Sequence, residues 1–414
     1  MNYDLRNGDC VEIMRSLPAN SVDSIVTDPP YELGFMGKSW DSTGIAYSVK
    51  MWDEALRVLK PGGHLLAFSG SRTYHRMACA IEDAGFEIRD QIMWVYGSGF
   101  PKSMDVSKAI DKQSNVHVEV IATGKSGKTA IWNEQGGMGN FNITAPTTDK
   151  AKQWAGWGTA LKPAHEPIVL ARKPLIGTVA TNVIIHGTGA LNIDGSRVGT
   201  EILVNQPGGI PNGANHFVNS SKELNRDRPA ITVQGRWPAN FIHDGSDEVV
   251  ELFPETKPSK ANPRNNSDFK SVSKGKETAH TTLGHNDNGG SAARFFYCAK
   301  ASKKDRNEGL DGFAEKRPDE RSETGMGTFT EKGVAKQSNH HPTVKPIDLM
   351  RYLVKLVTPP NGTVLDPFMG SGSTGKAAVL EHFSFIGIDQ SADYLEIATA
   401  RIKHAQEQIE GRLL

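Results

Sequence analysis

A buried-strand pattern at residues 22–26 ends in four residues that could do chemistry together: Asp28, Pro29, Pro30 and Tyr31. A carboxylate accepts hydrogen bonds, and a tyrosine ring offers a flat face for stacking. A proline pair keeps a loop stiff and adds no competing N–H donor. Taken alone, the four residues predict only a rigid turn at the end of a core strand, because such a turn needs no catalytic role.

A glycine-rich loop separates a strand pattern from a helix pattern within residues 364–380. Gly370 and Gly372 allow the backbone to approach a ligand closely, and the N–H groups at the start of the helix point toward it. The spacing from Gly370 to Lys376 also fits the phosphate loop of nucleotide triphosphatases. However, Ala377 replaces the serine or threonine that contacts magnesium in that loop.

Residues 122–129 are a second near match to the phosphate loop, and here the hydroxyl residue Thr129 is present. Ala122 replaces the first glycine and no helix pattern follows, so the helix N-terminus that binds phosphate is missing. A P-loop NTPase is therefore a disfavoured alternative. The better interpretation of residues 122–129 is a basic loop that touches a DNA backbone.

Three carboxylates follow strand patterns near the two ends of the chain: Asp9, Asp366 and Asp389. In doubly wound folds, an acidic side chain at a strand end reaches the ribose hydroxyls of an adenosine cofactor. Each carboxylate taken singly is explained equally well as a solvated strand end. On adjacent strands, the three together would form an adenosine-shaped site.

The elements that must position these residues alternate between strand and helix. Strands are expected at residues 3–9, 24–28, 64–70, 87–97, 362–368 and 384–389, and helices at residues 10–20, 49–63, 73–86, 346–360, 373–383 and 392–409. This alternation predicts an α/β fold with a parallel, doubly wound sheet. If the last helix is followed by the first strand, five strands form one uninterrupted series. We therefore expect a circularly permuted sheet that contains both ends of the chain.

Composition sets further limits. The middle of the chain, residues 174–338, is dense in Gly, Asn, Ser and Lys, which predicts a loop-rich insertion. The 47 basic and 47 acidic residues cancel, so net charge favours no class of partner. Three scattered cysteines argue against a disulfide scaffold and a metal site. No apolar segment reaches transmembrane length and the start is too polar for a signal peptide, so we expect a cytoplasmic protein.

Four motifs together resemble the S-adenosylmethionine-dependent DNA amino-methyltransferases. They are Asp-Pro-Pro-Tyr at 28–31, the glycine loop at 366–375, Asn-Gly-Asp-Cys at 7–10 and His-Pro-Thr-Val-Lys-Pro at 341–346. Their order resembles the β group of that family, in which a target-recognition region lies between the Asp-Pro-Pro-Tyr motif and the glycine loop. The resemblance implies a Rossmann-like catalytic domain at 1–173 and 339–414 and a target-recognition insertion at 174–338.

The resemblance also implies roles for individual residues. The positions that match the cofactor pocket are Asp9, Cys10, Thr343, Lys345, Asp366, Phe368, Gly370, Gly372, Thr374 and Asp389. Within this set, Thr343 and Lys345 match the segment that closes over the methionine end. The positions that match the catalytic loop are Asp28, Pro29, Pro30 and Tyr31.

The chemistry that this resemblance implies is methylation of an exocyclic amine. Such a nitrogen is a poor nucleophile until its lone pair turns out of the ring plane. Asp28 and the Pro29 carbonyl would each accept one amine proton, and the carboxylate would stabilise the positive charge that develops. Tyr31 would stack on a base that is flipped out of the duplex.

The leading interpretation is sequence-specific methylation of adenine N6 in double-stranded DNA. The Asp at position 28 favours adenine, because cytosine-N4 enzymes of this group more often carry Ser there; cytosine N4 is the alternative. A non-catalytic DNA-binding module gives no reason for an intact catalytic loop. The implied partners are S-adenosylmethionine and DNA, without metal or membrane. A homodimer, a separately encoded restriction endonuclease and a prokaryotic or phage origin stay open.

Overall fold

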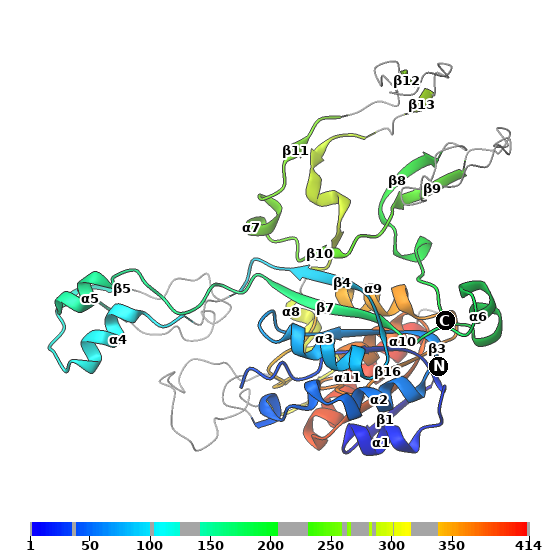
Figure 1. Ribbon diagram of the computed structural model, residues 1–414, viewed down its shortest axis with the longest axis horizontal. Helices are drawn as coiled ribbons and strands as arrows, with labels where there is room; N and C mark the ends of the chain where they lie inside the picture. Colours follow the sequence, from blue (N-terminus) through cyan, green and yellow to red (C-terminus); the bar gives the residue numbers. More distant parts are fainter. Residues whose placement is uncertain are drawn as a thin grey trace.

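The computed structural model describes residues 2–34, 39–99, 103–124, 141–205, 231–258, 263–265, 281–283, 287–300, 302–315 and 338–411. Within these residues the central sheet has nine strands (Figure 1). In sheet order they are β1 (Tyr3–Asn7), β17 (Ser384–Asp389), β16 (Thr363–Asp366), β2 (Val22–Thr27), β3 (Leu59–Phe68), β7 (His165–Arg172), β4 (Glu87–Val95), β10 (Phe241–His243) and β15 (Tyr297–Cys298). All neighbouring strands are parallel except β7, which runs antiparallel to β3 and β4.

The sheet confirms the doubly wound, circularly permuted series. From β16 the chain adds β17 on one side, and β1 then pairs in parallel with β17, with Tyr3 opposite Phe385. The next strands in the series, β2 and β3, lie on the other side of β16. The series therefore reverses direction between β16 and β2, and ligands of such sheets bind outside the carboxyl ends of the strands at that point.

Helices cover both faces of the sheet. On one face lie α1 (Cys10–Ser16), α2 (Val49–Val58) and α3 (Tyr74–Asp83), and on the other lie α9 (Ile347–Val357), α10 (Ser373–Leu380) and α11 (Ala392–Glu410). Successive strand residues point to opposite faces, so Ile25 packs into the first layer and Val26 into the second. Because β2 is covered on both faces, all six of its residues are buried, including the polar Asp23, Ser24 and Thr27.

The helix expected over residues 49–63 ends earlier, at Val58, and the strand β3 begins at Leu59. Pro61-Gly62-Gly63 therefore lies inside a strand, where the pairing register between β2 and β3 shifts. Gly62 has a φ of +77°, and a Cβ there would lie 2.4 Å from the amide nitrogen of Asn182. The glycines form an irregularity inside β3 and do not end the helix, because Asn182 and the residues on either side of its helix pack directly on this backbone.

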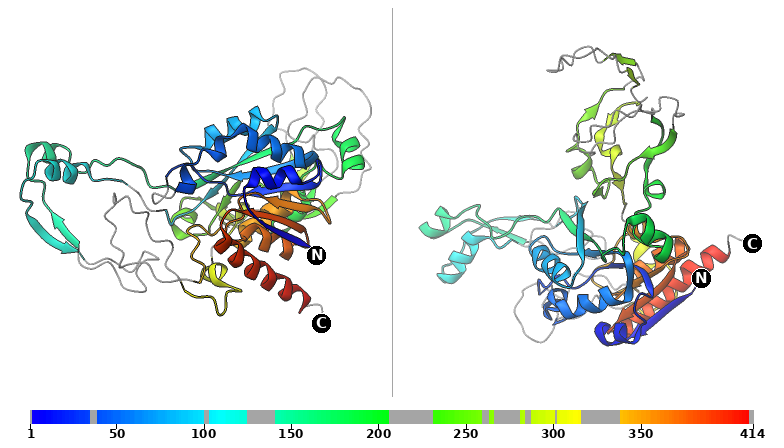
Figure 2. Two further views of the ribbon diagram at one scale, coloured as in Figure 1. Left: turned by 90° about the horizontal axis from the view of Figure 1, so that it is seen from below. Right: turned by 45° about the vertical axis from the view of Figure 1, so that its right-hand side comes forward.

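Two groups of elements project from the sheet (Figures 1 and 2). The first, between β4 and β7, is called the arm here and contains α4 (Val106–Gln113), β5 (Val120–Gly124), β6 (Phe141–Thr144) and α5 (Asp149–Gln153). The second lies on the β10 side and contains β8 (Val198–Asn205), β9 (Ile231–Arg236), α7 (Asp247–Val250), β11 (Glu255–Thr256), β12 (Pro263–Asn265), β13 (Thr281–Leu283) and β14 (Gly290–Ser291).

The remaining short elements connect these parts. They are η2 (Ser39–Ser42), η3 (Ile45–Tyr47), α6 (Val179–His186), η4 (Asp194–Ser196), η5 (Ala292–Phe295) and α8 (Lys303–Asn307). Among the helices described, none is both long and apolar enough to span a membrane. The range 174–338, expected as an insertion, contributes β10 and β15 to the central sheet.

Candidate active site

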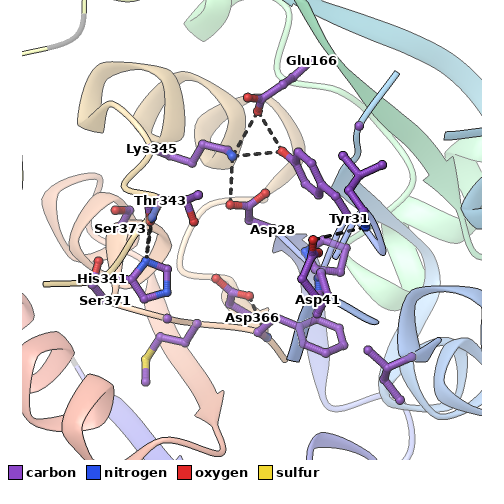
Figure 3. Close-up of a pocket in the computed structure, with 18 of the residues that line it drawn as sticks. Asp28, Tyr31, Asp41, Glu166, His341, Thr343, Lys345, Asp366, Ser371 and Ser373 are labelled. Atoms are coloured by element: carbon purple, nitrogen blue, oxygen red, sulfur yellow. Dashed lines mark hydrogen bonds and ion pairs between the residues drawn. The ribbon is translucent and has the colours of Figure 1, made fainter. Parts of the chain in front are cut away.

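A cavity of about 1420 Å³ lies at the carboxyl ends of β16 and β2, where the strand series reverses (Figure 3). Ordinary small-molecule pockets have volumes of roughly 300–1,000 Å³, so this cavity has room for two ligands side by side. All the residues that the resemblance assigned to the site line it except Gly372. Gly372 instead starts α10 with a φ of +79°, and a Cβ there would lie 2.9 Å from Ala398 on α11.

Asp28 lies at the carboxyl end of β2, where the strand series reverses. It follows Thr27, the last residue of β2, whose hydroxyl donates to Asp366 Oδ1 at the end of β16 over 2.6 Å. One oxygen of Asp28, Oδ2, lies 2.9 Å from Lys345 Nζ. The other oxygen, Oδ1, is buried and has no hydrogen-bond partner among the residues described. An acceptor left free in a buried position is one that a ligand donor could satisfy.

A second carboxylate, Glu166 on β7, stands beside Asp28 (Figure 3). Its Oε2 accepts from the Tyr31 hydroxyl over 2.8 Å and lies 3.1 Å from Lys345 Nζ. Lys345 Nζ also donates to the Tyr31 hydroxyl over 3.0 Å. The three N–H donors of an ammonium thus have three acceptors, all within this group.

This arrangement bears on the expected role of Lys345. Burial lowers the pKa of Lys345, but the charges of Asp28 and Glu166 outweigh it, so its pKa lies above the ordinary value. A lysine with all its donors engaged has none left for a cofactor carboxylate, so its geometry does not favour the sequence-based assignment to the methionine end. No sequence motif assigned a site role to Glu166, although it lies within 1–173, the first range expected to belong to the catalytic domain.

The glycine loop is held by Asp389. One oxygen of this carboxylate accepts from Gly370 N and the other from Ser391 N, each over 2.8 Å. Burial raises the pKa of Asp389 above its ordinary value. Each oxygen keeps a further lone pair that can bind a hydroxyl group.

His341 packs against the same loop and was not singled out by the sequence analysis. A Cβ at Gly370 would lie 2.7 Å from its Nε2, so the absent side chain makes room for the imidazole. Its Nδ1 lies 2.5 Å from the Thr343 carbonyl, and burial lowers the pKa of His341 to about 4. Arg306 also holds this segment, because its guanidinium donates to the His341 carbonyl over 2.8 Å. The segment 341–346 thus rests on the glycine loop.

The three strand-end carboxylates lie on neighbouring strands, since β16, β17 and β1 are adjacent. Asp9 caps α1, because its Oδ1 accepts from Val11 N and Glu12 N over 2.9 and 3.0 Å. Burial raises the pKa of the adjacent Cys10 thiol to about 12, so it is not a nucleophile at neutral pH. Burial also raises the pKa of Asp366 to about 7.

The structure argues against the P-loop alternative. Lys376, the lysine of the phosphate-loop pattern, is buried, does not line the cavity, and pairs with Glu308 over 2.5 Å. A lysine held in this way cannot reach a phosphate group at the loop. Most of the other near match, residues 122–129, lies outside the described residues.

The two projecting groups contribute unequally to the cavity. Residues 159–166, which lead from the arm into β7, line the cavity, whereas no described residue of 174–338 does so. In the second group, Arg236 and Arg294 lie over the Phe295 ring, and both pair with Asp287. Among the residues described, no cluster of His, Cys, Asp and Glu side chains could hold a metal ion.

Comparisons with known proteins agree on one class. A family model described as DNA methylase matches residues 22–400. The type II methyltransferase M.HindIII of Haemophilus influenzae is 24% identical over 230 residues, which cover 45% of this chain and 63% of that protein. The type II methyltransferase M2.DpnII of Streptococcus pneumoniae is 41% identical over 81 residues, covering 20% of this chain and 30% of that protein. Both alignments span less than two thirds of the relative.

Solved structures of low sequence identity also match. The cytosine-N4-specific PvuII DNA methyltransferase is 14% identical with a TM-score of 0.43, over 99% of this chain and 93% of that chain. The M1.HpyAVI–SAM complex is 15% identical with a TM-score of 0.37, over 97% of this chain and 99% of that chain.

Proposed function

This chain belongs to the DNA methylase family, and on that premise we propose that it transfers a methyl group from S-adenosylmethionine to adenine N6 in double-stranded DNA. The observation that carries the proposal is the buried Asp28 Oδ1, which has no hydrogen-bond partner in the described part of the chain and lies in a cavity with room for both a cofactor and a base. An exocyclic amine is the donor that this acceptor lacks.

The residues at the glycine loop fit an adenosine cofactor. The Asp389 carboxylate keeps lone pairs for the ribose hydroxyls, and Gly370 offers a backbone without a side chain beside it. Asp9, Cys10, Asp366, Phe368, Thr343 and Thr374 complete the proposed pocket, all on the cavity wall. When bound, S-adenosylmethionine supplies an electrophilic methyl group on a sulfonium.

The protein's part in the reaction follows from the Asp28–Tyr31 loop. Asp28 Oδ1 accepts a hydrogen bond from one N–H of the amine, and the Pro29 carbonyl accepts a hydrogen bond from the other. Together they hold the nitrogen with its lone pair out of the ring plane. As positive charge develops on the nitrogen, the nearby carboxylate stabilises it more than it stabilises the neutral amine. The Tyr31 ring, held by its hydroxyl on Glu166, is a surface on which the flipped base stacks.

Adenine is proposed as the target because Asp stands at position 28, and cytosine N4 is the alternative. We further propose that the projecting elements within 174–338 read the DNA sequence and that the arm, which leads into the cavity-lining residues 159–166, lies along the duplex. A solitary or restriction-associated enzyme of a prokaryote or phage fits this function equally.

The test is transfer of labelled methyl groups to unmethylated genomic DNA, followed by nucleoside analysis. N6-methyladenine is the expected product; N4-methylcytosine would move the target to the alternative, and neither product would refute the proposal. Asp28→Ala should abolish transfer while calorimetry finds S-adenosylmethionine binding retained. Asp83→Ala, a change of an exposed carboxylate at the end of α3, is the matched control and should transfer at the wild-type rate.

A further inference from the structure

The charge around Asp28 is balanced in a way that methyl transfer alone does not explain. Lys345 lies 2.9 Å from Asp28 and 3.1 Å from Glu166. All three side chains are at least four-fifths buried, with exposed fractions of 9% for Lys345, 20% for Asp28 and 19% for Glu166. Charges buried in this way interact far more strongly than they do in water.

An ammonium paired with Asp28 alone would work against the proposed reaction. It would cancel the negative charge that must stabilise the developing cation on the amine. Glu166 changes this balance, because two carboxylates and one ammonium leave a net charge of −1 in this group. Lys345 in turn prevents two neighbouring carboxylates from repelling each other without compensation.

We propose that Glu166 is a positioning residue that keeps the catalytic site net negative by sharing Lys345 with Asp28 and by anchoring the Tyr31 hydroxyl. The inference rests on the proposed function and extends it to residues on β7 and in the segment 341–346. Lys345 fixes Asp28 Oδ2, which leaves Oδ1 directed at the substrate amine. Because Lys345 also pairs with Glu166, its positive charge cancels less of the negative charge on Asp28.

The geometry gives each partner a distinct share in this role. Lys345 Nζ also lies over the Tyr31 and Phe68 rings, at 5.2 and 4.8 Å from their centroids, so aromatic faces hold the ammonium in place. The Tyr31 hydroxyl bridges Lys345 and Glu166. The aromatic ring proposed to stack on the base is therefore fixed by the same carboxylate that adjusts the charge.

Variants of matched shape test the charge balance. Glu166→Gln keeps an acceptor for Tyr31 but brings the net charge to zero, and it should lower the single-turnover transfer rate by about 10- to 100-fold. Lys345→Met in the same chain returns the charge to −1, so the double variant should regain part of that rate. Glu166→Asp keeps the charge and should stay closest to the wild type. Glu87→Gln, which breaks the 2.6 Å ion pair with Arg172 on the same sheet, is the control and should not change the rate.

Cofactor binding supplies a readout that needs no DNA. S-adenosylmethionine carries a positive sulfonium and S-adenosylhomocysteine a neutral thioether. Glu166→Gln should therefore weaken binding of the first relative to the second severalfold by calorimetry, and the double variant should restore the ratio. A loss of structure alone would weaken both ligands alike, and thermal melting of each variant detects it separately.

The outcomes separate this inference from the proposed function. A wild-type protein that transfers no methyl group refutes the proposed function and this inference with it. If the wild type transfers methyl groups, an undiminished Glu166→Gln rate overturns this inference alone. A double variant slower than Glu166→Gln also overturns it, because charge balance predicts recovery and a purely structural role predicts further loss.

Discussion

Asp366 should make the stability of the protein depend on pH in a direction opposite to that of most carboxylates. It is 2% exposed at the end of β16, and burial, opposed by hydrogen bonds from Thr27, Thr374 and Phe368 N, raises its pKa to about 7. The ordinary pKa of an aspartate is about 3.9. Between about pH 4 and pH 7 the folded protein therefore binds a proton at Asp366 that the unfolded chain has released.

The sign and size of the effect follow from proton linkage. Because the folded state binds more protons than the unfolded state in this window, the free energy of unfolding falls as pH rises. The slope is about 1.4 kcal/mol per pH unit, so the Asp366 contribution falls by on the order of 4 kcal/mol from pH 4 to pH 7. Stability from this group is complete below about pH 4 and is lost as pH rises through about 7.

Asp366→Asn isolates this contribution. The asparagine oxygen can still accept hydrogen bonds from the Thr27 hydroxyl and from Phe368 N, but the side chain does not titrate. In urea unfolding, the free energy of unfolding of the variant minus that of the wild type should increase by on the order of 4 kcal/mol between pH 4 and pH 8. Asp83→Asn, at an exposed position, should show no such gain. Parallel pH curves for Asp366→Asn and the wild type would refute burial of an ionisable carboxyl as the cause.

Three further predictions concern stability and DNA contact. Burial raises the pKa of Glu308, but the hydrogen bond and charge of Lys376 outweigh burial, so the pKa of Glu308 is about 2. Glu308→Gln should therefore lower the free energy of unfolding by about 3–5 kcal/mol at pH 7. The difference in melting temperature from the wild type should shrink as pH falls toward 2. Gly375→Ala would place a Cβ 2.5 Å from the Phe385 ring, and urea unfolding should find it destabilised by about 1–3 kcal/mol; an unchanged midpoint would mean that α10 shifts freely. Trp157→Ala, at an arm residue that is 59% exposed, should weaken DNA binding by roughly tenfold in fluorescence anisotropy and leave cofactor affinity unchanged. Equal DNA affinities of the variant and the wild type would mean that Trp157 does not contact the duplex.

The sequence by itself determined the order of the strands and which strand ends carry the candidate site residues. Apolar strands bounded by turns are local patterns, so Asp28, Asp366 and Asp389 could be placed at strand ends without knowledge of the fold. The permuted order followed from the same patterns, because a parallel sheet needs a helix between consecutive strands. The end of α2 was misjudged, since a proline and two glycines also serve as a bulge inside β3.

The tertiary structure alone decided which of these residues share a contact. Glu166 stands 135 residues from Tyr31 in the chain, and Lys345 stands 314 residues from it, yet hydrogen bonds join all three. Local patterns carry no information on such pairings, because they arise when β7 enters the sheet antiparallel between β3 and β4. The surroundings of Asp28 are therefore a property of the folded sheet, and the Lys345 contact with Oδ2 leaves Oδ1 as the oxygen without a partner among the residues that the structure describes.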